Sequence, residues 1–246
     1  MTSTARIPVF GTFNFRDAGG YPADGGTVRT GKLFRSDSID KLGTVGRSQL
    51  DAIGVRRIID LRDDFEAQAM PDDIAGLDID VRRLPLFEGS AAAQGTIGIS
   101  LAELYARIVT LHAGVVVEAL RDLAHSGEDA VLVHCTAGKD RTGIVVALAL
   151  LAVGVPRQTV LDDYSKSQTN LSGEWLDGML AFIAGHGVEQ TPELRVLLGG
   201  SPPDALATTI DLIDRDYGSV REYLIEKGMS ERDLVLLRES LVYSIR

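Results

Sequence analysis

Residues 130–153 read AVLVHCTAGKDRTGIVVALALLAV, and this stretch decides the fold. Its first five residues, 130–134, are apolar up to His134 and predict a buried strand. Residues 142–153 predict a buried helix, because 144–153 are a continuous apolar run. A short loop joins the two, and it begins at Cys135 and reaches Arg141 after five intervening residues.

The loop between Cys135 and Arg141 has the properties of an anion-binding site. A tight loop at a helix N-terminus can turn successive backbone N–H groups inward around a tetrahedral dianion. Gly138 gives the backbone freedom inside the turn, and Arg141 can donate two hydrogen bonds to phosphate oxygens. The same positive environment favours the thiolate form of Cys135, which makes it a nucleophile aimed at phosphorus. The alternative is a buried structural cysteine at a strand end.

Outward from this unit, the chain predicts strands interleaved with helices, followed by helices alone. The predicted strands cover residues 32–35, 57–61 and 80–84, and the predicted helices cover residues 48–53, 100–123 and 142–153. Pro156 starts a further helix, and a Ser230-x-x-Asp233 capping box starts the last one. The pattern predicts an α/β sheet flanked by helices in a single domain, 1–246, with a helical region over 156–246.

Composition excludes several classes of protein. The 246 residues are 45% hydrophobic, which is inconsistent with a disordered chain, and 25 Lys and Arg against 35 Asp and Glu give a net charge of −10. That charge disfavours nucleic acid as a partner. Cys135 is the single cysteine, so neither an internal disulfide nor a four-cysteine zinc site can form. The longest apolar run, 144–153, is too short for a membrane helix, and residues 1–20 lack a signal-peptide pattern. We therefore expect a cytoplasmic protein. Export by a route that needs no cleaved signal stays open.

The segment HCTAGKDRTG resembles the cysteine-based protein tyrosine phosphatases, whose loop is His-Cys-x5-Arg-Ser/Thr. More narrowly, it is similar to bacterial tyrosine and phosphoinositide phosphatases. Further matching residues are 14–17, 33–36, 60–62 with Glu66, and 211–223. The resemblance implies a mostly parallel central sheet with helices on both sides. It also implies a lid formed by the C-terminal helices and catalysis without metal or cofactor.

The resemblance assigns a role to each loop residue. Cys135 would form a phosphocysteine that water hydrolyses, Arg141 would bind the phosphoryl oxygens, and Asp140 would be the general acid. Thr142 would either donate its hydroxyl to the sulfur or satisfy backbone groups at the helix start. The substrate-binding set is Thr136, Ala137, Gly138, Lys139 and Thr142.

Four residues outside this set are weaker candidates. His134 is expected to orient the loop. Glu88 stands where related sequences carry an acidic Asp, and the alternative is a solvated carboxylate. Asp60 and Arg62 would line the pocket rim or form a structural pair.

The substrate follows from Lys139, whose flexible charge suits a second phosphate. Both a phosphoprotein and a phosphoinositide are therefore expected substrates, and the oligomeric state is open. Two alternative functions stay open. One is a phosphate-binding module without turnover, and the other is a sulfur-transfer or redox enzyme that uses a single cysteine.

Overall fold

A five-stranded sheet carries the loop motif at its centre. The computed structural model describes residues 5–86, 99–185, 187 and 189–244. The strands of this sheet are β1 (Arg16–Asp17), β4 (Leu33–Ser36), β5 (Val55–Asp60), β6 (Asp80–Arg83) and β7 (Ala130–His134). Their spatial order is β1-β4-β7-β5-β6, in which β4, β7, β5 and β6 are parallel and β1 is antiparallel to β4. The prediction of a mostly parallel sheet is confirmed.

A second, smaller sheet joins the two ends of the chain. It has three antiparallel strands in the order β2 (Pro22–Ala23), β3 (Gly26–Val28) and β8 (Val242–Ser244). The sequence did not predict it, because strands of two or three residues are too short to show an alternating pattern.

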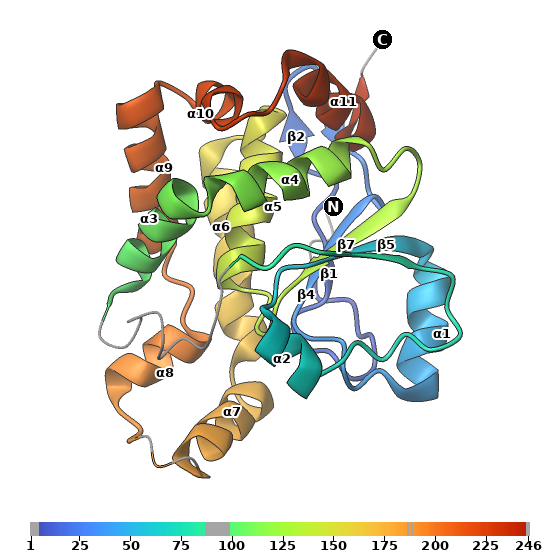
Figure 1. Ribbon diagram of the computed structural model, residues 1–246, viewed down its shortest axis with the longest axis vertical. Helices are drawn as coiled ribbons and strands as arrows, with labels where there is room; N and C mark the ends of the chain where they lie inside the picture. Colours follow the sequence, from blue (N-terminus) through green and yellow to red (C-terminus); the bar gives the residue numbers. More distant parts are fainter. Residues whose placement is uncertain (1–4, 87–98, 186, 188, 245–246) are drawn as a thin grey trace.

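Helices flank the central sheet and make up the C-terminal half, as predicted (Figure 1). They are α1 (Gly43–Ile53), α2 (Asp64–Ala69), α3 (Leu101–Leu111), α4 (Ala113–Ala124), α5 (Asp140–Ala152), α6 (Arg157–Leu171), α7 (Glu174–Gly185), α8 (Pro192–Gly199), α9 (Pro203–Tyr217), α10 (Val220–Glu226) and α11 (Glu231–Leu241). Among the described helices, none has the length and apolar character needed to cross a bilayer.

Helix boundaries follow the local signals, with two corrections. Helix α1 begins at Gly43, five residues before the predicted start at 48. The single helix predicted over 100–123 is two helices, α3 and α4, because the backbone of His112 leaves helical geometry at φ −111° and ψ 17°. Gly54 ends α1 in a left-handed conformation, which is common for a glycine that follows the last helical residue. The capping box of Ser230 and Asp233 at α11 is confirmed.

Apolar side chains cover both faces of the central sheet. Along β7, Val131 and Val133 belong to the larger apolar cluster, whereas Ala130 and Leu132 belong to the smaller one. This follows from the two-residue period of a strand, which sends alternate side chains to opposite faces. The smaller cluster lies under α1, and the larger one lies under the helices on the other face.

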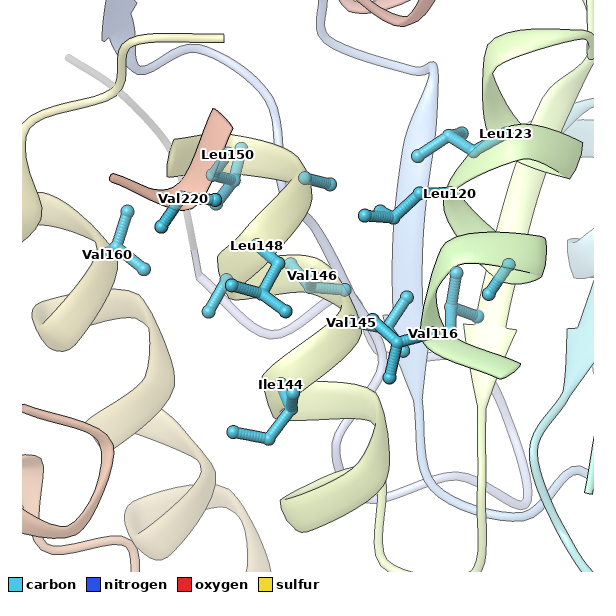
Figure 2. Close-up of a cluster of buried hydrophobic side chains, with 14 of the residues drawn as sticks. Val116, Leu120, Leu123, Ile144, Val145, Val146, Leu148, Leu150, Val160 and Val220 are labelled. Atoms are coloured by element: carbon cyan, nitrogen blue, oxygen red, sulfur yellow. The ribbon is translucent and has the colours of Figure 1, made fainter. Parts of the chain in front are cut away.

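Helix α5 lies in the middle of the larger cluster. Its residues 142–150 are all buried, which explains why its sequence is apolar all round instead of amphipathic. Figure 2 shows Leu120 and Leu123 of α4 on one side of α5, with Val160 and Val220 of α6 and α10 on the other. The N-terminus of α5, which follows the loop, is thereby held rigidly by packing on several sides.

Candidate active site

The loop 135–139 lies at the carboxyl edge of the parallel strands. Ser36 and Asp60, which end the neighbouring strands β4 and β5, both pair in register with His134 at the end of β7. Open α/β sheets bind ligands at this edge. Cys135 is the first residue after β7, and its side chain is buried, with 1% exposure.

Three consecutive loop carbonyls are hydrogen-bonded on the outer side of the loop. The carbonyl of Thr136 accepts a hydrogen bond from Ser38 N at 3.0 Å. Nδ2 of Asn14 donates to the carbonyls of Ala137 and Gly138 at 3.0 and 3.1 Å. The carbonyl of Gly138 also accepts from Arg35 Nη2 at 2.9 Å. In a planar trans peptide the N–H of the next residue points opposite to the carbonyl. The N–H groups of residues 137–139 are therefore directed away from these partners, toward the inside of the loop. Such converging amides form an anion-binding nest.

Gly138 is required at its position for two reasons. Its φ is +62°, a conformation that other residues adopt at a cost. A Cβ atom there would lie 2.1 Å from the carbonyl oxygen of Ser36. The loop can therefore lie directly against the end of β4 only with glycine at this position.

Buried charges fix the groups that hold these carbonyls. Asp163 of α6 pairs with Arg35 Nη1 at 2.9 Å and Arg16 Nε at 3.3 Å. Burial would raise the pKa of Asp163, but the two arginines lower it to about 2. Arg16 also donates to the side chain of Asn14 at 2.5 Å. The loop is thus held by a network that reaches α6. From the sequence, Arg16 and Arg35 lie in two of the segments that match the family, whereas the pair Asp162-Asp163 is expected on a solvated helix face. That expectation is wrong for Asp163, which is buried against the two arginines.

Arg141 is held by Glu66 of α2. Its Nη1 and Nη2 atoms donate to the two carboxylate oxygens of Glu66 at 2.6 and 2.7 Å, and Thr136 Oγ1 donates to Glu66 at 2.5 Å. Burial would raise the pKa of Glu66, but the hydrogen bonds and charge of Arg141 lower it from 4.5 to about 2. Burial likewise disfavours the charge of Arg141, yet the bonds with Glu66 and the attraction of Cys135 raise its pKa. The guanidinium is therefore permanently charged and electrostatically coupled to the cysteine.

Glu66 was not among the predicted site residues. A local signal existed, because Asp63-x-x-Glu66 is a capping box that starts α2 directly after β5. The capping box indicates a helix at the active edge of the sheet. It does not indicate that the same carboxylate reaches across to Arg141.

Asp140 and Lys139 begin α5 next to the loop. Oδ1 of Asp140 accepts from Tyr105 Oη at 2.5 Å and lies 3.4 Å from Lys139 Nζ. Lys139 is fully buried, and its Nζ donates to the carbonyls of Leu197 and Gly200 at 2.7 and 2.8 Å. The ammonium group thus binds the C-terminal end of α8, where a positive charge is favourable. Its expected contact with a second phosphate remains a prediction.

Thr142 and His134 are both buried beside the loop. Within the described part of the chain, Thr142 Oγ1 has no hydrogen-bond partner, neither the sulfur nor a backbone group. His134 Nδ1 lies 3.4 Å from the carbonyl of Cys135, and its Nε2 lies 3.4 Å from Asp72 Oδ2. His134 therefore contacts the loop backbone on one side and a carboxylate on the other.

Asp60 and Arg62 are buried and bonded to each other. Arg62 Nε and Nη2 donate to the two oxygens of Asp60 at 2.9 and 3.0 Å, and Nη2 also donates to Asp72 at 2.7 Å. This arrangement fits the structural alternative. Glu88, the other candidate acid, lies outside the described residues.

One cluster of possible metal ligands occurs among the described residues. Asp60, Asp72 and His134 have ligand atoms within 4.8 Å of one another. The guanidinium of Arg62 already pairs with both carboxylates, so a cation would have to compete with a fixed positive charge. The chemistry of this donor set does not favour a metal.

Comparison with known proteins agrees with this geometry. The model of the tyrosine phosphatase family matches residues 7–243, which include the loop, Asn14, Arg35, Glu66 and Asp163. The chain belongs to this family. Its loop and the residues that hold it therefore lie within the part of the chain that matches the family.

The similar proteins match over most of their length. The chain is 29% identical to the triple specificity protein phosphatase PtpB of Mycobacterium tuberculosis, over 94% of this chain and 97% of that protein. It is 30% identical to a tyrosine-protein phosphatase of Nostoc commune, over 89% of this chain and 75% of that protein. A crystal structure of P. aeruginosa TpbA with a cysteine-to-serine substitution, in complex with pTyr, aligns at 21% identity over 65% of this chain and 90% of that one, with a TM-score of 0.35.

Proposed function

We propose that this protein is a cysteine-dependent phosphomonoesterase acting on phosphotyrosine in proteins, with phosphoserine, phosphothreonine and phosphoinositides as further substrates. One observation carries the proposal: three consecutive loop carbonyls are bonded outward beside Cys135. The opposing N–H groups and the charge of Arg141 would surround a phosphoryl group placed against the sulfur. The mycobacterial relative is named a triple specificity protein phosphatase, which supports the broad substrate range.

The proposed reaction has two steps. In the first, the Cys135 thiolate forms a bond to phosphorus while the bond from phosphorus to the leaving oxygen breaks. Asp140 gives its proton to that oxygen, and the alcohol leaves. In the second, water attacks the phosphocysteine and Asp140 takes a proton from it, so inorganic phosphate leaves and the thiolate is restored. Arg141 and the loop amides stabilise the charge of the equatorial oxygens in both steps.

The test of this mechanism is phosphate release by wild type and Cys135→Ser. The substrates are a phosphotyrosine peptide, a phosphoserine peptide and phosphoinositide vesicles, assayed side by side. We expect release by wild type and none by the variant, while both bind vanadate or phosphate. Rapid acid quenching with a ³²P-labelled substrate should leave label on residue 135 in wild type alone.

Two results would contradict the proposal. Binding of a phosphopeptide by wild type without release would favour a phosphate-binding module. Equal release by wild type and Cys135→Ser would exclude the cysteine as nucleophile. A chelator such as EDTA is expected to leave the rate unchanged, because no step uses a metal.

A further inference from the structure

We propose that Tyr105 and Tyr164 form a chain of hydroxyl groups that positions Asp140 and directs its acid proton to Oδ2. Tyr105 lies on α3, Tyr164 on α6 and Asp140 at the start of α5, so three helices contribute to the chain. The inference rests on the proposed role of Asp140 as general acid. It adds two positioning residues to that role, neither of which touches the substrate.

The hydroxyl geometry fixes the direction of the hydrogen bonds. Tyr105 Oη donates to Asp140 Oδ1 at 2.5 Å and lies 2.6 Å from Tyr164 Oη. A phenol carries one proton, and that of Tyr105 is used on the carboxylate. Tyr164 must therefore be the donor to Tyr105. The two rings stand edge to face, with centroids 6.0 Å apart, which restricts rotation of both side chains.

Both phenols stay protonated throughout the working pH range of such an enzyme. Burial and the negative charge of Asp140 raise the pKa of Tyr105 well above its ordinary value of 10.0. The same two causes raise the pKa of Tyr164. Each tyrosine can therefore act as a hydrogen-bond donor and not as a base, and the chain runs one way, toward the carboxylate.

The donors converge on one oxygen of Asp140. Oδ1 faces Tyr105 and, at 3.4 Å, the ammonium of Lys139. A proton placed on Oδ1 would compete with the proton of Tyr105, so the acid form carries its proton on Oδ2. The side chain of Asp140 is 21% exposed, which leaves it accessible from the solvent side. Tyr105 thus selects which oxygen can protonate the leaving group.

The experiment compares leaving groups in Tyr105→Phe. p-Nitrophenyl phosphate releases an acidic phenol that needs little protonation, whereas phenyl phosphate releases a more basic one. We expect kcat/KM of the variant to fall about tenfold or more with phenyl phosphate and by less than about threefold with p-nitrophenyl phosphate, within the range of general acid catalysis. This ratio reports the step in which the leaving group departs, whereas hydrolysis of the phosphocysteine is common to both substrates. The inhibition constant of inorganic phosphate should stay within about twofold, since the side chain of Tyr105 is fully buried.

Two further variants make the result specific. Tyr223→Phe is the matched control, because its buried hydroxyl donates to the carbonyl of Val109 on α3 at 2.8 Å, away from Asp140. It should show no dependence on the leaving group. Tyr105→Phe combined with Asp140→Asn should lose no more than Asp140→Asn alone, because both substitutions remove the same function.

The proposal is wrong if Tyr105→Phe slows both substrates equally, or neither, or if its effect adds to that of Asp140→Asn. If Tyr105→Phe does not fold, Tyr164→Phe removes only the outer hydroxyl and should show a weaker version of the same pattern. Failure of the proposed function looks different, because Cys135→Ser would then keep its activity or wild type would release no phosphate. An Asp140→Asn variant without leaving-group dependence would overturn the acid assignment and this inference with it.

Discussion

Replacing Glu66 with glutamine removes one negative charge from the active site with little change in side-chain shape. In the structure that charge accepts two hydrogen bonds from Arg141 and one from Thr136. The carboxylate of Glu66 is 23% exposed, so solvent screens its interaction only in part. We expect Glu66→Gln to destabilise the fold by leaving the charge of Arg141 without its partner.

The magnitude follows from the pKa of Glu66, about 2 in the folded protein against an ordinary 4.5. At about 1.4 kcal/mol for each tenfold difference in proton affinity, the ionised carboxylate stabilises the fold by about 3 kcal/mol. Because the folded pKa is the lower one, this stabilisation is fully present above pH 4.5 and is lost as the pH falls through 2. At pH 3 about 1.5 kcal/mol should remain.

The assay is urea unfolding of wild type and Glu66→Gln at pH 6.5 and pH 3. The difference in unfolding free energy should be about 3 kcal/mol at pH 6.5 and about half of that at pH 3. Glu103→Gln is the matched control, because Glu103 occupies the same capping-box position at the exposed start of α3, where the charge of Arg107 has only a small effect on its pKa. The reasoning would be refuted if Glu66→Gln lowered the unfolding free energy no more than Glu103→Gln does. It would also be refuted if the loss in Glu66→Gln were independent of pH.

Three further substitutions test the loop and its supports. Gly138→Ala should lower kcat/KM by a hundredfold or more with any phosphate ester, because the added Cβ meets the carbonyl oxygen of Ser36 at 2.1 Å and displaces the anion-binding amides. The loss corresponds to about 3 kcal/mol of activation free energy, and steady-state kinetics would measure it. Asp163→Asn should reduce the unfolding free energy by about 3–5 kcal/mol, because two buried arginines lose their counter-charge. A melting temperature within about 2 °C of wild type would contradict this prediction, because it corresponds to a loss of no more than about 1 kcal/mol. Lys139→Met should speed hydrogen exchange of the last backbone amides of α8, because the Lys139 ammonium binds the carbonyls of Leu197 and Gly200 at the end of that helix. Unchanged exchange would show that α8 is held by other contacts.

The central part of the fold was predictable because its signals are local. Residues 130–133 of β7 and 144–150 of α5 are apolar and buried, and the intervening loop combines Cys135, Gly138 and Arg141 at fixed spacing. The smaller sheet and the break at His112 were not predictable. The strands of that sheet are too short to show a period, and the helical pattern of residues 100–123 continues through His112 without interruption.

The sequence by itself determined which groups are available for chemistry in the loop, because a cysteine, a glycine turn and an arginine lie within seven consecutive residues. Only the tertiary structure decided what holds them. Asn14 bonds to Ala137 across 123 positions, and Arg35 pairs with Asp163 across 128. Glu66 reaches Arg141 across 75, and Tyr105 reaches Asp140 across 35. Such contacts depend on how the helices pack around the sheet, and packing is set by all the buried side chains together instead of by any local pattern.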